Sequence, residues 1–323
     1  MKALRYAQNG APSDVISIVD VPLPEPAPGT VRIRLTRSPI HNHDLMTVSG
    51  HYGLRPPLPA TAGSEMLGTV DALGDGVGHL ALGGRVATIA VGAWAEAAVV
   101  PAQGCVPMPD GFPDDVACQL LAMPMSAVVL LDYLHVEAGA WILQNAAGGA
   151  VGRILMTLAQ ARGINIVNLV RSEGAASELT ALGAKHVVVT GDDSWPSRVL
   201  EAAGGPVARV IDSVCDRTSV ALLRLLGKGG EYLIFGALAG EAPRIDPGLF
   251  IFHELVLRGF WMTAWMARAD DAARTSALRR VFELATLGEL PLPVAGVYAL
   301  GDYAAALTEA QRPGRAGKVL FRA

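Results

Sequence analysis

The segment from Trp141 to Gly163, "WILQNAAGGAVGRILMTLAQARG", constrains the fold more than any other part of the sequence. A short apolar run is followed by a glycine-rich turn and then by an amphipathic stretch that ends at a glycine, as a helix C-cap does. A second apolar run, "NIVNLV", begins shortly afterwards. A strand, a helix and another strand in such close succession favour a parallel sheet.

The glycine-rich turn contains Ala147-x-Gly149-x-x-Gly152, which differs from G-x-G-x-x-G only at its first residue. The chain has 36 glycines, so the pattern gains meaning only from its place between a predicted strand and a predicted helix. Glycines there let a pyrophosphate approach the backbone, and the first N–H groups of the helix face its charge. The alternative is a tight turn without a ligand. We predict dinucleotide binding by Gly148, Gly149, Ala150, Val151 and Gly152.

The end of the second predicted strand bears on the choice between NAD and NADP. An acidic residue there would hydrogen-bond the ribose 2′-hydroxyl, but the sequence reads "NLVRSEG", with Val170 at this place. Arg171, followed by Ser172, suits a 2′-phosphate through charge and forked hydrogen bonds. Two alternatives stay open: Glu173 takes the acid's place if the loop is shifted, and Arg171 is a solvated surface charge. We expect NADPH.

The length of 323 residues is about twice that of a typical domain and indicates two domains. Up to about residue 115, short apolar runs such as "TVRIRL" are broken by Pro and Gly, which is typical of a small β-barrel. Beyond it, strands alternate with helices and predict a doubly wound parallel sheet of six strands. We therefore expect one domain over residues 1–115, completed by about 268–323, and a second over 116–267.

Composition and charge exclude several classes of protein. A formal net charge of −4 gives no reason to expect a nucleic-acid partner. The longest uncharged run, "VACQLLAMPMSAVVLL", is short for a membrane span and contains Pro124, so we interpret it as a buried helix. The first residues lack the apolar core of a signal peptide, and three dispersed cysteines fit a reducing compartment. We expect a cytoplasmic protein that acts on a small molecule, without a membrane partner.

The order of barrel, dinucleotide-binding domain and return to the barrel resembles the medium-chain dehydrogenase/reductase superfamily. Within it, "GHYGLRPPLPATAGSE", "NLVRS" and "FIFHELVLRGFWMTAW" resemble the zinc-free 2-enoyl thioester reductases of mitochondrial type. The NADPH quinone oxidoreductases come next, and the "AAGG" turn is closer to them. The resemblance implies a GroES-like β-barrel catalytic domain, a Rossmann domain for NADPH, and a homodimer formed through the last Rossmann strand.

The activity implied by the resemblance is hydride transfer from NADPH to an activated C=C bond of an enoyl thioester or an enone. A quinone oxidoreductase and a catalytically idle NADPH-binding protein remain as alternatives. Tyr52, in Gly50-His51-Tyr52-Gly53, matches the catalytic tyrosine of the enoyl reductases, whose O–H stabilises the enolate.

The family's N-P-x-T-A loop, on the substrate side of the nicotinamide, corresponds to residues 123–127, "MPMSA". Met123 replaces the asparagine and Ser126 the threonine, which removes a side-chain amide near the nicotinamide. The resemblance implies cofactor contacts from this loop and from three later places in the chain. The matching residues are Met123, Phe235, Gly236, Ala237, Leu238, Phe260, Trp261, Met262 and Lys318.

The stretch "IHNHDLMTVSGHYG" holds three histidines and an aspartate and raises the question of a metal site. In the zinc alcohol dehydrogenases of this superfamily, a cysteine and the histidine of a G-H-E motif bind the metal. His41 and Ser64 stand at those places here. A catalytic zinc needs three protein ligands, so we expect no functional metal. A weak site formed by His41 and His43 stays open.

Overall fold

The computed structural model describes all 323 residues, and these form two compact units. Unit 1 comprises Met1–Ala122 and Leu292–Ala323, and unit 2 comprises Met123–Pro291. None of the helices combines the length and the apolar character needed to cross a membrane.

Unit 1 consists mainly of short strands, as its Pro- and Gly-interrupted sequence predicts. Its strands are β1 (Lys2–Tyr6), β2 (Ser17–Asp20), β3 (Thr30–Pro39), β4 (Ala60–Thr61), β5 (Glu65–Leu73), β6 (Arg85–Ile89), β7 (Ala97–Pro101), β8 (Cys105–Pro107), β15 (Val294–Ala299) and β16 (Lys318–Arg322). Its helices are α1 (Pro12–Val15), α2 (Asn42–Val48), α3 (Asp114–Ala117) and α12 (Tyr303–Gln311), with 3₁₀ turns η1 (Ala102–Gly104) and η2 (Leu300–Asp302).

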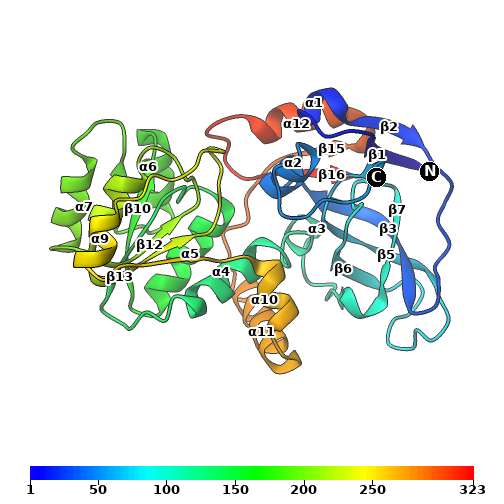
Figure 1. Ribbon diagram of the computed structural model, residues 1–323. Helices are drawn as coiled ribbons and strands as arrows, with labels where there is room; N and C mark the ends of the chain where they lie inside the picture. The colour runs from blue at the N-terminus through cyan, green and yellow to red at the C-terminus, as the bar shows by residue number, and fades with distance from the viewer. The chain divides into compact units, whose positions relative to one another are not determined.

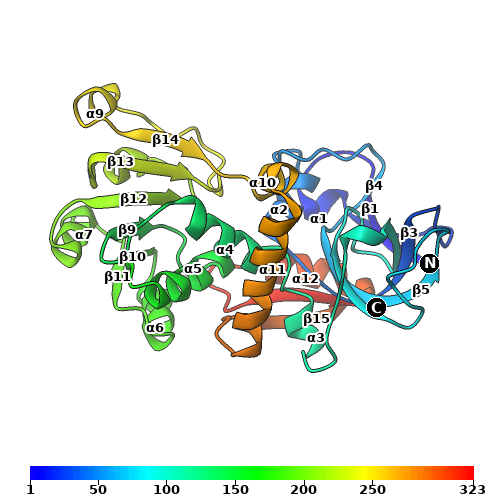
Figure 2. The same ribbon diagram turned by 90° about the horizontal axis from the view of Figure 1, so that it is seen from below.

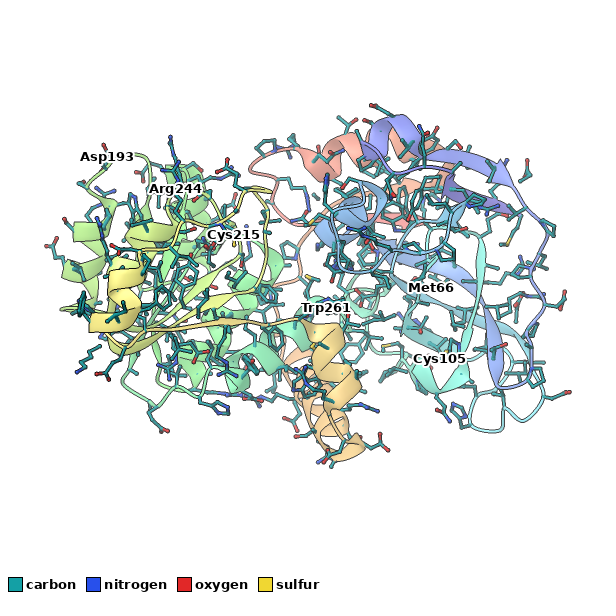
Figure 3. All side chains as sticks on the ribbon, viewed as in Figure 1. Met66, Cys105, Asp193, Cys215, Arg244 and Trp261 are labelled. Carbon is teal, nitrogen blue, oxygen red and sulfur yellow. The ribbon has the colours of Figure 1, made fainter.

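The larger sheet of unit 1 has the order β15-β16-β3-β5-β6-β8, with β7 also paired to β3, and a smaller sheet has the order β2-β1-β4. The C-terminal strand β16 therefore lies antiparallel to β3 from the other end of the chain (Figure 1). The core contains Trp94 and Phe321, whose rings meet edge to face at 5.2 Å. Met66 and Cys105 are buried among these strands (Figure 3).

Unit 2 alternates strands and helices. Its strands are β9 (Trp141–Gln144), β10 (Asn165–Val170), β11 (His186–Val189), β12 (Val207–Asp212), β13 (Leu226–Ile234) and β14 (Val256–Gly259). Its helices are α4 (Met123–Tyr133), α5 (Ala150–Ala161), α6 (Glu173–Ala181), α7 (Trp195–Ala203), α8 (Ser219–Arg224), α9 (Pro247–Phe252), α10 (Met262–Arg268) and α11 (Asp271–Thr286).

The six strands of unit 2 form one parallel sheet in the order β11-β10-β9-β12-β13-β14 (Figure 2). The chain moves outward from β9 to β11, crosses back to β12, and then moves outward in the opposite direction. Because such crossovers are right-handed, the helices that follow the two directions cover opposite faces. The predicted doubly wound sheet is confirmed, and its switch point lies between β9 and β12. In sheets of this kind, ligands bind at the carboxyl ends of the strands beside that point.

The boundaries between the units differ from those expected at residues 115 and 267. The first unit continues to Ala122, because the backbone N–H groups of Leu121 and Ala122 donate to the side chain of Glu65 in β5. The second unit continues to Pro291, because α11 packs against α4. The prediction that residues from about 268 onward complete the barrel is wrong for α11, because its apolar residues Ala277, Val281 and Leu284 are buried within unit 2.

Candidate functional site

The glycine turn between β9 and α5 has the geometry of an anion cradle. Gly149 is the N-cap of α5, a helix of 12 residues, so the first N–H groups of this helix have no partner within it. A side chain added at Gly148 would meet no atom within 4 Å, which leaves the turn open. At Gly152, an added Cβ would lie 2.7 Å from the carbonyl oxygen of Ala147, so only glycine fits there. Gly148–Gly152 therefore fit the pyrophosphate of a dinucleotide.

Arg153 holds this turn in place, a role that the sequence patterns did not indicate. Its guanidinium is buried and donates to the Gly148 carbonyl at 2.8 Å and to the Glu178 carboxylate at 2.6 Å. Glu178 belongs to α6, which starts directly after Arg171 and Ser172. One buried cation, Arg153, thus links the glycine turn to α6, the helix that follows Arg171 and Ser172.

The turn between β10 and α6 carries the residues expected to select NADPH. Val170 is the last residue of β10, and Arg171 and Ser172 are exposed between strand and helix. The Ser172 hydroxyl caps α6 by accepting from the N–H of Ala175 at 3.3 Å. Glu173 is the first helical residue and does not occupy the strand end. An exposed arginine without an acid at the strand end suits a 2′-phosphate better than a free 2′-hydroxyl.

The carboxyl ends of β13 and β14 bring together the later predicted cofactor residues. Phe235 and Phe260 follow these neighbouring strands, and their ring centroids are 6.0 Å apart. Phe260 is buried and also packs against Tyr133, whereas Trp261 is exposed over 41% of its surface. Gly236, Ala237 and Leu238 continue the β13 loop, Met262 begins α10, and Met123 begins α4.

In unit 1, Tyr52 lies in the loop between α2 and β4 and is partly exposed. Its ring is stacked on that of His43, with centroids 5.5 Å apart. His43 in turn shares a hydrogen bond of 2.7 Å between its Nε2 and the Ser64 hydroxyl. The tyrosine therefore stands beside an imidazole whose orientation is set by a second side chain.

Behind these residues lies a buried group of ionisable side chains, His41, Glu65 and Lys318, which we call the Glu65 cluster. His41 and Glu65 are fully buried and meet at 2.7 Å between Nε2 and Oε2. Burial raises the pKa of the Glu65 carboxyl to about 7, although backbone N–H groups oppose the change. Burial also holds the pKa of His41 well below its ordinary value, and lowers that of Lys318 to about 8.

Lys318 was expected to approach the cofactor. Its Nζ lies 3.5 Å from the Ile40 carbonyl within unit 1. In the sequence, Lys318 and Glu65 each begin an apolar strand. This pattern does not indicate which residues the two side chains contact.

The residues of this region do not fit a catalytic zinc, which needs three protein ligands. The Nε2 atoms of His41 and His43 are directed to two different partners, Glu65 and Ser64. The structure holds no group of three or more His, Cys, Asp or Glu side chains arranged to bind a metal ion.

Two family models match the chain. The alcohol dehydrogenase GroES-like domain matches residues 27–110, within unit 1, and the zinc-binding dehydrogenase domain matches residues 150–278, within unit 2. Among curated proteins, the mitochondrial enoyl-[acyl-carrier-protein] reductase of Homo sapiens is 29% identical, with 97% of this chain and 86% of that protein covered. The enzyme of the same name from Arabidopsis thaliana is 28% identical, with 82% and 73% covered.

Among solved structures, a quinone oxidoreductase of Pseudomonas syringae is similar, with a TM-score of 0.91 and 26% identity over 100% of this chain and 99% of that one. A mycobacterial protein solved in complex with NADPH has a TM-score of 0.90 and 28% identity, and both chains are covered completely. The two domain models together with these full-length likenesses agree with the fold and with the order of its parts. The chain belongs to the medium-chain dehydrogenase/reductase superfamily.

Proposed function

We propose that this protein is an NADPH-dependent reductase that transfers hydride to an activated C=C bond, in a 2-enoyl thioester or an enone, without zinc. The observation that carries the proposal is Tyr52. A phenol stands beside His43 in the region where the related dehydrogenases hold their metal, and the histidines there are occupied by other side chains. The enoyl-[acyl-carrier-protein] reductases among the relatives support the same reaction class.

NADPH is the cofactor that the residues of unit 2 fit. The open glycine turn suits the pyrophosphate, and the exposed Arg171 suits the 2′-phosphate. A similar solved structure contains NADPH, which supports the assignment. When bound, this cofactor supplies the hydride.

The residues of unit 1 then act on the substrate. Hydride addition to the β-carbon moves negative charge onto the carbonyl oxygen, and the Tyr52 hydroxyl donates a hydrogen bond to that oxygen. A phenol keeps its proton at neutral pH and can therefore donate this hydrogen bond. His43 packs against the Tyr52 ring and restricts its movement, while Ser64 holds the imidazole. Protonation of the α-carbon completes the reduction.

The test compares wild type with Tyr52→Phe, using NADPH oxidation against crotonyl-CoA, longer enoyl-CoAs, simple enones and quinones. We expect turnover of an enoyl-CoA or an enone, a loss of about 100-fold in kcat for the variant, and unchanged NADPH affinity. Full activity of the variant would contradict the role of Tyr52. NADPH binding by wild type without turnover of any of these substrates would favour an idle NADPH-binding protein.

A quinone oxidoreductase is the second candidate, because a solved structure of that name covers the whole chain at 26% identity. The replacement of the family's loop asparagine by Met123 also fits it, since a quinone has no thioester to orient. A quinone takes its proton from water more readily than an enolate carbon does. Quinone reduction that survives Tyr52→Phe would therefore select this candidate.

We also propose a homodimer formed through β14. This strand is the outer member of the sheet and pairs only with β13. Val256 and Leu257 on it, and Ile251 and Phe252 just before it, are exposed apolar residues, which an edge strand in water normally avoids. Light scattering after gel filtration tests the dimer, and Leu257→Lys should shift the protein towards the monomer. A wild-type monomer at micromolar concentration would contradict the proposal.

A further inference from the structure

Unit 2 contains a second buried polar group, centred on the Asp212 carboxylate at the end of β12, which the sequence patterns did not indicate. Asp212 is completely buried. Its Oδ1 accepts from the Asn145 side-chain amide at 2.5 Å, and from the backbone N–H groups of Val214 at 2.8 Å and Cys215 at 2.9 Å. Its Oδ2 accepts from the hydroxyl of Tyr232 and, at 3.5 Å, from that of Ser219. We call these residues the Asp212 network.

The Asp212 network joins three loops at the carboxyl edge of the sheet. Asn145 opens the glycine turn after β9, and its Oδ1 also accepts from the N–H of Ser213 at 2.7 Å. The loop after β12 then accepts from the loop after β13: Leu238 donates to Ser213 at 3.2 Å, and Ala239 donates to Val214 at 2.9 Å. All three loops lie at the strand ends beside the switch point, where a dinucleotide binds in such folds.

The loop after β12 is held in a conformation that it would not adopt freely. Cys215 has a φ of +53°, a left-handed conformation that is unfavourable for a residue with a side chain. Its N–H donates to Asp212, and its thiol donates to the Gly236 carbonyl at 3.2 Å. Cys215 therefore contacts both the buried carboxylate and the loop expected to contact the cofactor. Strained residues persist where the surrounding contacts hold them.

Tyr232 sets the orientation of the carboxylate. It is buried in β13, and its ring packs into the core of unit 2 while its hydroxyl reaches Oδ2. With Oδ2 fixed in this way, Oδ1 faces the N–H groups of Val214 and Cys215. We propose that Tyr232, acting through Asp212, is a positioning residue that holds the loops after β9, β12 and β13 ready to bind NADPH. The inference rests on the proposed cofactor.

The experiment compares wild type, Tyr232→Phe and a control, Thr88→Val. The phenylalanine keeps the ring packing and removes only the hydroxyl. Thr88 is a buried residue of unit 1 whose hydroxyl donates to the Gly104 carbonyl at 3.1 Å, so the control removes a buried hydrogen bond away from the loops. NADPH affinity is measured by titration calorimetry, and hydrogen–deuterium exchange reports on the peptides that contain Val214, Cys215, Leu238 and Ala239.

We expect Tyr232→Phe to raise the Kd for NADPH about tenfold, in line with one lost hydrogen bond to a charged group, and to speed exchange in those peptides. Its KM for NADPH should rise more than its kcat falls. Thr88→Val should lower thermal stability without changing the NADPH Kd. Asp212→Asn should retain much of the affinity, because the hydroxyls of Tyr232 and Ser219 can turn to accept from the new amide.

A Tyr232→Phe variant that is less stable but has the wild-type Kd and wild-type exchange would overturn the inference, because the network would then serve stability alone. If wild type binds NADPH tightly and only the variant result fails, the proposed function stands. If wild type does not bind NADPH, the proposed cofactor fails, and the positioning inference fails with it.

Discussion

The Glu65 cluster of unit 1 and the Asp212 network of unit 2 each hold a buried carboxylate, but the two carboxylates differ in the hydrogen bonds that they accept. Asp212 accepts from five groups, three of which are N–H donors and two of which are hydroxyls. Glu65 accepts two backbone N–H groups on one oxygen, while the other faces only His41, whose Nδ1 is buried without a partner. Burial accordingly raises the pKa of Glu65 to about 7.

The difference shows what each carboxylate can do. The donors around Asp212 come from the turn after β9, the loop after β12, helix α8 and strand β13, so removing the carboxylate would free these segments from one another. At Glu65 the proton itself can move: the ionised carboxylate accepts from the Nε2–H of a neutral His41, and the protonated form donates to Nε2 while His41 carries its proton on Nδ1. One region therefore fixes geometry, and the other can change its protonation close to neutral pH.

The largest effect is expected from Asp212→Ala. Four donors would lose their acceptor inside the protein, whereas the Ser219 hydroxyl would keep the Asp216 carbonyl at 2.8 Å. This loss should lower the free energy of unfolding of unit 2 by about 3–5 kcal/mol. Urea unfolding followed by tryptophan fluorescence measures this, because four of the five tryptophans, including Trp195 in the core, belong to unit 2. Glu65→Ala should cost less, because the Glu65 side chain has fewer hydrogen bonds to lose. A larger loss for Glu65→Ala would reverse the comparison.

The second prediction concerns pH. The folded pKa of Glu65, about 7, lies above its ordinary value of 4.5, so the folded protein keeps a proton that the unfolded chain has lost. The resulting stability is fully present below pH 4.5 and is lost as the pH rises through 7. Between pH 4.5 and pH 7, the free energy of unfolding of wild type should fall by on the order of 3 kcal/mol relative to that of Glu65→Gln. Thermal unfolding of both proteins from pH 4.5 to 8 measures the difference. A constant difference across this range would contradict the prediction.

The smallest effect is expected from a surface ion pair in unit 2. Lys228 and Glu254 meet at 2.9 Å, but both side chains are about two-thirds exposed. Water and salt screen such pairs, so Glu254→Gln should change the free energy of unfolding by less than about 1 kcal/mol. The same urea experiment serves as the measurement. An effect approaching that of Asp212→Ala would show that burial is not what separates the two carboxylates from ordinary charges.

The parallel six-stranded sheet, the strand-rich unit before it and the glycine turn could all be predicted from the sequence. These follow from local patterns: alternating strands and helices, turns rich in Pro and Gly, and a glycine at position 152 that no side chain can replace. Arg171 could be placed in its turn for the same reason, because Val170 ends an apolar run.

Which polar residues meet inside each unit could not be predicted in this way and became visible only in the folded chain. Asp212 is 67 residues from Asn145 and 20 residues from Tyr232 in the sequence. Each of the three stands at the end of an apolar strand or within one, and nothing in the sequence indicates that they share hydrogen bonds. The apolar face of α11, formed by Ala277, Val281 and Leu284, can be found in the sequence, but the sequence does not indicate that this helix packs against α4. Local sequence patterns indicate whether a segment is a helix or a strand. Whether a charge can be buried depends on which hydrogen-bond donors the folded chain brings to it.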